Sequence, residues 1–424
     1  MNEGLFVILA LLGLSLAGMP IYLSLGIGTM VALGMADMPM IVLPQKLFAG
    51  MNSSSLLAIP FFILAGNLMS RSITMKLVDV ANALIGWVRG SLAVVTVAAS
   101  ALFGAISGSG VATASAIGGI MIPAMKKEGY EAHYASAVNS ISSILGPIIP
   151  PSITLIVYAS ITNVSVARLF IGSLLPGIIL ATVLIGYNLY YGRKHDLPAH
   201  KRMPIKQIGK TMGSSIWALL MPVIILGGIF GGVFTPTEAA AVAVLYALLV
   251  SLFIYRDLKL KELPKMLVDS AVGTATIMMM VGLSKASSYV IVTSGLPQML
   301  LDLVPAITNN RLVVLLLLNI LFLIIGMLME ANAAIVMMTP LLTSLMAAYQ
   351  IDPLQFGIVM SFNLCIGLVT PPVGLTMLMS TQIAETSVSK TMRSLMPMLL
   401  LSIAVLMLIT YVPQITTWLP SMIN

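Results

Sequence analysis

The sequence has few charged residues, few aromatic residues and only one cysteine. Lys, Arg, Asp and Glu make up 8% of its 424 residues, whereas soluble domains carry about 25%. The hydrophobic fraction is 59% and the mean hydropathy is +1.05. The single cysteine, Cys365, excludes an intrachain disulfide and any site built from several cysteines. This composition excludes a soluble globular domain and predicts an all-α polytopic membrane protein.

The sequence also lacks the motifs of common catalytic sites. It contains no HExxH zinc motif, no phosphate-binding loop and no pair of membrane aspartates suited to proteolysis. We therefore predict that the chain is not an enzyme, uses no organic cofactor and is driven by a gradient rather than by a nucleotide. The net charge of +7 comes from short loops between apolar stretches, as membrane orientation requires. We expect the lipid bilayer around the chain and no nucleic-acid partner.

One pattern occurs twice in the chain. In each half, an apolar stretch is broken by small polar residues, and a later stretch is broken by paired prolines. In the first half these breaks are 107–110 and 146–152, and in the second half they are 330–332 and 370–374. Interrupted hydrophobic segments at matching places in two halves are the best sequence indication of a secondary transporter's binding site.

Basic residues predict how the chain is threaded through the membrane. The loops 192–210 and 256–265 are rich in Lys and Arg, so both should be cytoplasmic. Residues 91–125 have Arg89 before them and Lys126 after them, which places both ends on the same side. We therefore expect a re-entrant hairpin whose arms are each about half a span and whose tip turns near mid-membrane.

The resulting fold prediction is two inverted repeats, each with five spans and one hairpin. The first repeat, 1–191, contains spans 2–18, 20–38, 43–70, 133–160 and 165–191, a surface arm helix at 72–89 and the hairpin 91–125. Residues 192–210 form a cytoplasmic linker. The second repeat, 211–424, contains spans 212–232, 237–255, 266–295, 353–384 and 394–417, an arm at 297–311 and the hairpin 312–346. The broken helices are 133–160 and 353–384, and both termini are expected in the periplasm.

The hairpin tips and the proline breaks are the candidate binding sites. Glycine permits turns that other residues resist, and proline removes amide donors and frees carbonyl groups. Freed carbonyls and nearby hydroxyls are oxygen ligands suited to a hard cation such as Na⁺. Close helix packing or a simple kink would need the same residue types, but the recurrence in both halves favours binding. The expected substrate-binding residues are Ser107, Ser109, Thr113, Asn332 and Thr370. The expected Na⁺ ligands are Ser107, Gly108, Ser109, Gly146, Pro150, Glu330, Thr370, Pro371 and Gly374.

Few charged residues fall inside apolar stretches. Glu330 could bind a cation, cap the turn at Asn332 or pair with a base, because an intramembrane carboxylate is a functional hypothesis by default. Lys285 could pair with Glu330 or with a substrate carboxylate, and we expect a structural pair. Glu238 follows Thr235 and Pro236, which predicts a capping box with a structural role.

Four longer motifs resemble those of one known family, the large membrane subunit of tripartite ATP-independent periplasmic transporters. These motifs are Ser107–Gly118 (SGSGVATASAIG), Leu145–Ser152 (LGPIIPPS), Phe234–Ala241 (FTPTEAAA) and Ile366–Gly374 (IGLVTPPVG). They occur in the family's order, and the resemblance covers essentially the full chain.

The resemblance implies an importer of organic acids, such as dicarboxylates or the sugar acid sialic acid, in the bacterial inner membrane. It also implies Na⁺ coupling, an elevator motion of the hairpins, a small four-helix membrane subunit and a periplasmic substrate-binding protein. One alternative is a stand-alone Na⁺- or H⁺-coupled carboxylate transporter of a related inverted-hairpin fold. Another is a membrane scaffold without transport, but a scaffold would not need two broken half-helices, which cost backbone hydrogen bonds.

Overall fold

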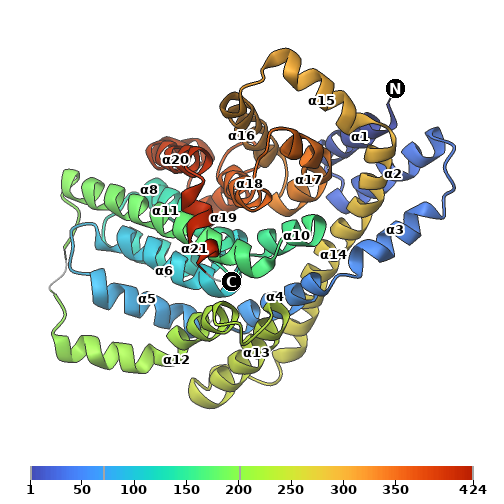
Figure 1. The fold of residues 1–424 in the computed structure, drawn as a ribbon. Coiled ribbons are helices and arrows are strands. Elements are labelled where there is room, and N and C mark those ends of the chain that lie inside the picture. The colour runs from blue at the N-terminus through green and yellow to red at the C-terminus, as the bar shows by residue number, and fades with distance from the viewer. Residues whose placement is uncertain (1, 70–71, 200–201, 423–424) are drawn as a thin grey trace.

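A computed structural model describes residues 2–69, 72–199 and 202–422, and these residues form helices and no strand (Figure 1). The expected all-α architecture is therefore confirmed. The expected periplasmic positions of Met1 and Asn424 lie outside the described residues, as do residues 200 and 201 of the linker.

The first half begins with two short helices and a bent pair. These helices are α1 (Glu3–Leu16), α2 (Ile21–Met35), α3 (Val42–Met51), the short helix η1 (Ser54–Leu57) and α4 (Ala58–Met69). Next come the arm helix α5 (Ser72–Ile85) and the hairpin formed by α6 (Ser91–Ser107) and α7 (Gly110–Lys127). The broken helix consists of α8 (Ala132–Ser143), α9 (Leu145–Ile148) and α10 (Ile153–Thr162), and α11 (Val166–Lys194) follows it.

The second half has its elements in the same order. It begins with α12 (Ile205–Phe230), α13 (Pro236–Leu249) with η2 (Val250–Ile254), and α14 (Leu263–Thr293). The arm helix α15 (Leu296–Ile307) precedes the hairpin of α16 (Arg311–Leu328) and α17 (Ala331–Ala348). The broken helix is α18 (Pro353–Gly367) with α19 (Leu375–Ala384), and the chain ends with α20 (Val388–Tyr411) and α21 (Gln414–Ser421).

Helix lengths confirm a polytopic membrane protein but revise two expectations. In the described part of the chain, eight helices are long and apolar enough to cross a membrane, or nine if the pair 42–69, bent by 61°, counts as one span. Helices α1 and α2 have 14 and 15 residues, or about 21–23 Å, which is shorter than the expected spans 2–18 and 20–38.

The hairpin arms are longer than the expected half-span. They have 17 or 18 residues each, or about 26 Å, because only the few residues at each tip interrupt otherwise continuous helices. Both ends of a hairpin still emerge on one side of the membrane, whether its arms are tilted or cross fully. The longer arms therefore do not change which side of the membrane each loop is expected to occupy.

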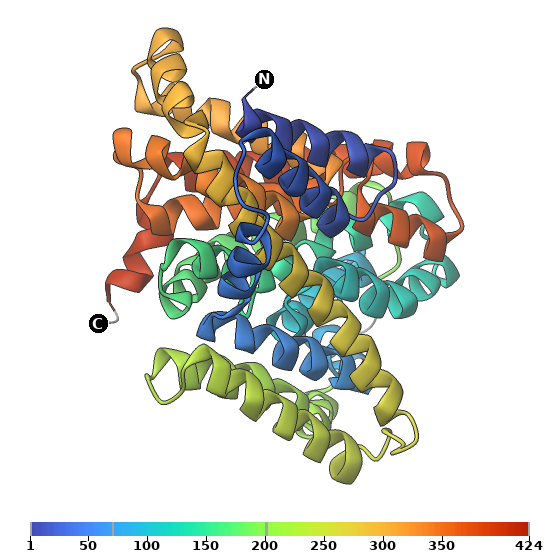
Figure 2. The ribbon, with the colours of Figure 1, turned by 90° about the vertical axis from the view of Figure 1, so that its right-hand side faces the viewer.

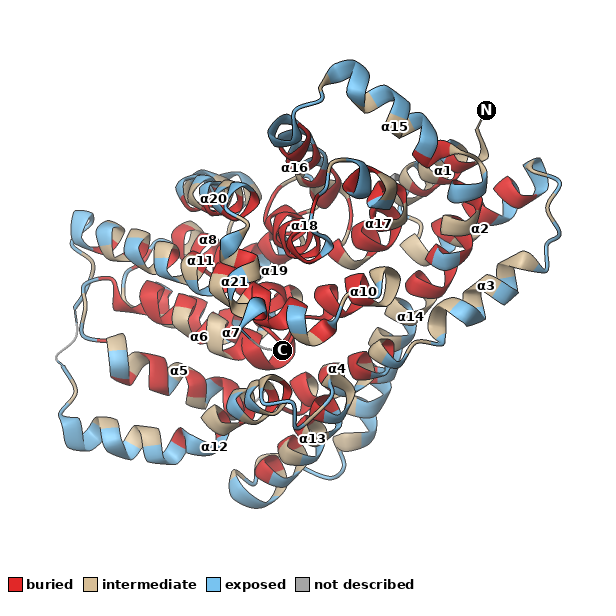
Figure 3. Ribbon diagram, viewed as in Figure 1, coloured by how far each residue is buried: buried red, intermediate tan, exposed pale blue. Residues whose placement is uncertain are grey.

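The helices differ in how deeply they are buried (Figure 3). In its most apolar window, the stretch 132–162 is 89% buried, whereas α12 and α14 are each 28% buried. Helices α10 and α18 lie in the middle of the molecule, and α12 and α13 lie at its edge (Figure 1). Figure 2 shows α14 crossing one face obliquely, where it packs against α3 and α4.

Glycine pairs set close contacts between hairpins and broken helices in both halves. A Cβ added to Gly104 of α6 would lie 2.7 Å from the Cα of Gly146 in α9. A Cβ added to Gly367 of α18 would lie 2.3 Å from the backbone carbon of Gly326 in α16. Real Cβ atoms do not approach so closely, so at these two glycine contacts the first arm of each hairpin lies backbone against backbone on the broken helix of its own half.

Candidate functional site

The tip of the first hairpin is a tight turn with one left-handed residue. Helix α6 ends at Ser107, Gly108 has φ +61°, and the hydroxyl of Ser109 accepts the amide of Ala112 at 3.4 Å to start α7. A side chain at Gly108 would meet the carbonyl oxygen of Pro151 at 2.6 Å. Gly110, the other glycine of the predicted break 107–110, is the first residue of α7 and has no positive φ. Gly108 alone makes the turn because the Ser109 cap restores helical geometry at once.

Oxygen atoms gather where this tip meets the first proline break. The hydroxyls of Ser107 and Thr113 lie 3.2 Å apart, and Thr113 donates to the carbonyl of Ser109 at 2.8 Å. A Cβ added to Gly146 would lie 2.6 Å from the Thr113 hydroxyl and 2.7 Å from the Ser109 carbonyl oxygen. The structure therefore brings 107–110 and 146–152 together, as the sequence predicts.

Both proline breaks contain a carbonyl group that takes a hydroxyl partner. In the first break, the carbonyl of Pro147 accepts from Ser152 at 2.5 Å and from Thr154 at 3.3 Å. In the second break, the carbonyl of Leu368 accepts from the hydroxyl of Thr376 at 2.9 Å and from its amide at 3.1 Å. We expected the freed carbonyls to need a partner, and for these two carbonyls the cap or first turns of the following helix supply hydroxyls.

At the second tip, Glu330 caps a helix. Its carboxylate accepts the amides of Asn332 and Ala333 at 3.0 and 3.3 Å, and the side-chain amide of Asn332 at 2.7 Å. The Oδ1 atom of Asn332 is buried and accepts no hydrogen bond from the residues that the structure describes. Exchanging the amide's oxygen and nitrogen would set two oxygens against each other, so this free acceptor is a consequence of the Glu330 contact.

The expected pair between Lys285 and Glu330 is wrong. The described residues contain no ion pair between them, and the two side chains line different cavities. The sequence placed both residues inside apolar stretches, but it did not show that Glu330 would face one cavity and Lys285 another.

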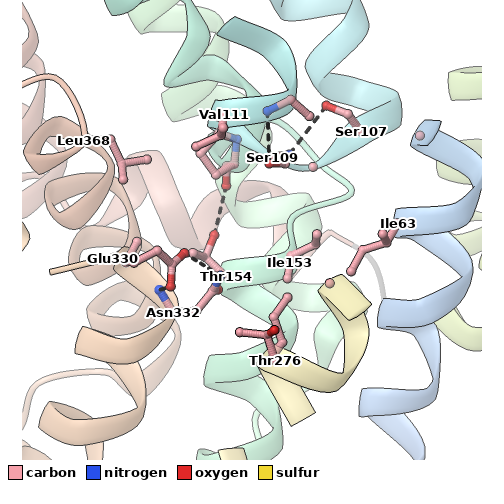
Figure 4. Close-up of a pocket in the computed structure, with 18 of the residues that line it drawn as sticks. Ile63, Ser107, Ser109, Val111, Ile153, Thr154, Thr276, Glu330, Asn332 and Leu368 are labelled. Atoms are coloured by element: carbon pink, nitrogen blue, oxygen red, sulfur yellow. Dashed lines mark hydrogen bonds between the residues drawn. The ribbon is translucent and has the colours of Figure 1, made fainter. Parts of the chain in front are cut away.

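One cavity of about 820 Å³ joins the two hairpin tips (Figure 4). Ser107 and Ser109 lie on one side of it and Glu330 and Asn332 on another, with Thr154 between them in this view. Further walls include residues 20–22 at the start of α2, part of α4, and the half of α14 between 269 and 280. Residues more than 200 positions apart thus form one chamber, and oxygen-bearing side chains from both halves face it.

The expected site residues fall into two groups. Those that line the cavity are Ser107, Gly108, Ser109, Glu330 and Asn332. Those that do not line it are Thr113, Gly146, Pro150, Thr370, Pro371 and Gly374. In the second group, the hydroxyl of Thr370 donates to the carbonyl of Ile366 at 2.9 Å, and Gly374 starts α19 with φ +47°.

Several polar residues that line the cavity escaped the sequence analysis. These are Asn67, Thr154, Asp269 and Thr276. Asn67 donates to the hydroxyl of Ser270 at 2.8 Å, which links α4 to α14. Asp269 had a usable signal, because a carboxylate within a membrane stretch is a functional hypothesis by default. The others have no signal in one sequence, since hydroxyl and amide side chains are common in helices.

Comparisons with known proteins identify a family. A family model described as the DctM component of the tripartite ATP-independent periplasmic transporter matches residues 6–415. The C4-dicarboxylate TRAP transporter large permease protein DctM of Pseudomonas aeruginosa is 38% identical, over 89% of this chain and 88% of that protein. The sialic acid TRAP transporter large permease protein SiaM of Vibrio cholerae is 35% identical, over 97% of both chains.

The fold is also similar to a solved structure. The crystal structure of the Alcanivorax borkumensis YdaH transporter matches with a TM-score of 0.59 at 13% identity, over 89% of this chain and 87% of that one. At this identity the similarity concerns the fold alone.

Proposed function

The chain belongs to the DctM components of the tripartite ATP-independent periplasmic transporters, and we propose that it is the permease subunit of a Na⁺-coupled importer of organic acids that receives its substrate from a binding protein. The family membership makes it a multi-pass transport permease. Its substrate, ion and partners are proposals.

The cavity between the two hairpin tips is the observation that carries this proposal. Its volume of about 820 Å³ falls within the roughly 300–1,000 Å³ of small-molecule sites. Ser107, Ser109 and Asn332 offer donors and acceptors to a polar ligand there. Two relatives are named for C4-dicarboxylates and for sialic acid, and carboxylate is common to both. An organic acid is therefore the substrate class that fits, with Thr113 and Thr370 acting from behind the cavity wall.

We place two Na⁺ sites where a hairpin tip meets a break. The first would use oxygens of Ser107, Gly108, Ser109, Gly146 and Pro150. The second would use oxygens of Glu330, Thr370, Pro371 and Gly374. The donor set fits because Na⁺ takes hard oxygen ligands, as other hard cations do. The convergence of hydroxyl and carbonyl oxygens at Ser107, Ser109 and Thr113 supports the first site. The Val373 amide donates a hydrogen bond to the Met327 carbonyl at 3.2 Å. This bond supports the second site because it holds the second break against its hairpin.

Transport would proceed by an elevator motion of the two hairpins, within a fold of two inverted repeats, 1–191 and 211–424. The hairpins and broken helices carry the polar groups, so they would move together past α1, α2, α12 and α13. The cavity is lined by the half of α14 nearest the basic loop 256–265, which should be cytoplasmic. The structure would then represent a state open to the cytoplasm, with both termini in the periplasm.

The family's name describes a transporter of three parts. The two partners of this chain would be a small four-helix membrane subunit and a periplasmic substrate-binding protein, in a bacterial inner membrane. The peripheral helices offer the apolar surface that a membrane partner or lipid would cover.

Reconstitution tests this function directly. The chain is placed in liposomes alone, with the small subunit, and with both partners, and uptake of radiolabelled succinate and sialic acid is measured under an inward Na⁺ gradient. We expect uptake of one of them only with all three components and only with Na⁺ outside. Uptake by the chain alone would instead support the stand-alone carboxylate transporter.

A further inference from the structure

A second cavity lies at the other half of α14. Its volume is about 600 Å³, and its walls come from 49–54, 160–163, 281–292 and 340–344. Helix α14 therefore lines both cavities, the first with residues 269–280 and the second with residues 281–292. The second cavity is the one farther along α14 from the basic loop 256–265.

Lys285 is the charged group of this cavity. Its lining residues are otherwise neutral, many of them Ser, Thr or Asn, with no Asp or Glu among those described. The Lys285 side chain is exposed and makes no ion pair in the described chain. A Cβ added to Gly50 of α3 would lie 2.8 Å from the Lys285 Cβ. The helices are thus too close at this point for the ammonium to lie between them, so it reaches the cavity.

The position of this lysine needs an explanation. An unpaired ammonium within a membrane segment costs free energy and is a functional hypothesis by default. Lysines also concentrate on the cytoplasmic side, whereas Lys285 is on the opposite half of its helix. One turn further out, the Lys46 ammonium lies 4.4 Å from the centre of the Tyr289 ring. Two cations therefore follow one face of α14 toward the side away from the basic loops.

We propose that this second cavity is an anion-binding vestibule, in which the Lys285 ammonium and the surrounding hydroxyl and amide groups hold the carboxylate of an organic acid. The proposal rests on the proposed function, because an importer receives its substrate in the periplasm and the vestibule would open to that side. This anion site is separate from the cavity at the hairpin tips. A carboxylate bound there would lie beside α17, whose Val336 carbonyl accepts from Ser284 of α14 at 2.7 Å.

The proposal can be tested without measuring transport, by comparing how fast anionic and cationic reagents modify a cysteine introduced near Lys285. Ser288 lies one turn from Lys285 and lines the same cavity. Ser288→Cys is made in a Cys365→Ser background, and the purified chain is treated with anionic and cationic methanethiosulfonate reagents. Lys285→Gln should lower the anionic-to-cationic rate ratio about 3- to 10-fold, as expected for one unit charge roughly 6 Å away. Lys285→Arg should retain the ratio.

A matched control lies on the same helix. Thr276 lines the first cavity, and Lys285→Gln should leave the rate ratio of the Thr276→Cys variant unchanged. Succinate should slow labelling of the Ser288→Cys variant when Lys285 is present and lose this protection in Lys285→Gln, while uncharged 1,4-butanediol should protect neither. In intact cells, membrane-impermeant reagents should reach the thiol of the Ser288→Cys variant from outside.

An unchanged rate ratio in Lys285→Gln, or succinate protection that survives it, would overturn the vestibule. Uptake is measured separately in the reconstituted three-part complex. Protection that depends on Lys285 without any carboxylate uptake would retain the anion site and discard the importer. Carboxylate uptake without Lys285-dependent protection would retain the importer and discard the anion site.

Discussion

The buried hairpins and broken helices of this protein use the same sequence motifs as its peripheral helices, but for different functions. Glu238 at the edge caps α13 in a capping box with Thr235, and Glu330 in the middle caps α17. Glu238 only starts a helix, as expected from the sequence, whereas Glu330 also faces the cavity. Glycines differ in the same way: Gly367 is pressed on another backbone, and Gly227 of α12 has nothing within 4 Å. A local motif therefore acquires a function from what surrounds it.

The largest expected difference is between Gly367 and Gly227 when each is changed to alanine, which adds one methyl group. Gly367→Ala puts a Cβ 2.3 Å from backbone atoms and should destabilise the chain by about 1–3 kcal/mol, as overpacking does. It should also abolish most uptake, because the added methyl group would push the second break away from its hairpin, and the proposed second Na⁺ site lies between them. Gly227→Ala should be neutral or slightly stabilising, since Ala favours helix over Gly. Thermal unfolding of the solubilised variants measures both, and equal melting temperatures would contradict the packing described.

The next effect concerns the two capping carboxylates. Glu330→Gln keeps an acceptor for the amides of α17 but removes the charge beside the proposed second Na⁺ site. The Na⁺ concentration for half-maximal uptake should rise about 10- to 100-fold, from the lost attraction between neighbouring unit charges. Glu238→Gln should leave it unchanged. The measurement is uptake against external Na⁺ in proteoliposomes, and a normal Na⁺ dependence in Glu330→Gln would remove Glu330 from the ion site.

A smaller effect is expected from two capping serines. Ser109 caps α7 at the cavity, and Ser165 caps α11 at the surface, each accepting an amide at 3.4 Å. Either change to Ala should cost about 0.5–2 kcal/mol of stability. Only Ser109→Ala should also raise the half-maximal Na⁺ concentration, by about tenfold, equivalent to roughly 1.4 kcal/mol. Thr370→Ala should shift Na⁺ dependence less, because its hydroxyl is engaged within its own helix. If Ser109→Ala and Ser165→Ala behave alike, Ser109 is a cap and nothing more.

Much of the fold was predictable because breaks and charges leave local signals. The Ser-Gly-Ser-Gly run predicted the first hairpin tip, and paired prolines predicted both broken helices. The order of elements followed from the basic loops and apolar lengths. The arm lengths were misjudged because the sequence marks where a hairpin turns, but not how far its helices tilt.

The site was predictable only where a residue type itself is unusual. Glu330 and the tip serines stood out, whereas Thr154 and Asn67 enter the cavity only because distant helices meet there. The wrong pairing of Lys285 with Glu330 has the same origin, since contact between helices is a property of packing and not of either segment. Whether hydroxyls would satisfy the freed carbonyls was equally hidden, because Ser152 and Thr376 depend on the geometry of the break.

The central claim is that the hairpins move past the surrounding helices, and one disulfide tests it most directly. A Cβ built on Gly66 of α4 lies 3.6 Å from the Ser107 Cβ at the first tip, within the roughly 3.5–4.5 Å of disulfides. Helix α4 packs on α13, which should stay fixed. A control pair, Ala10→Cys with Gly28→Cys, joins two helices expected to stay together. Its Cβ atoms are 3.1 Å apart, so α1 and α2 must move apart by about 0.4 Å for the disulfide to reach the same range.

In a Cys365→Ser background, oxidation of Gly66→Cys with Ser107→Cys should stop Na⁺-driven uptake, and reduction should restore the level seen before oxidation. The control pair, once crosslinked, should continue to support uptake. Uptake that persists through a complete crosslink between positions 66 and 107 would show that the tip stays beside α4 throughout the cycle, which contradicts the elevator motion.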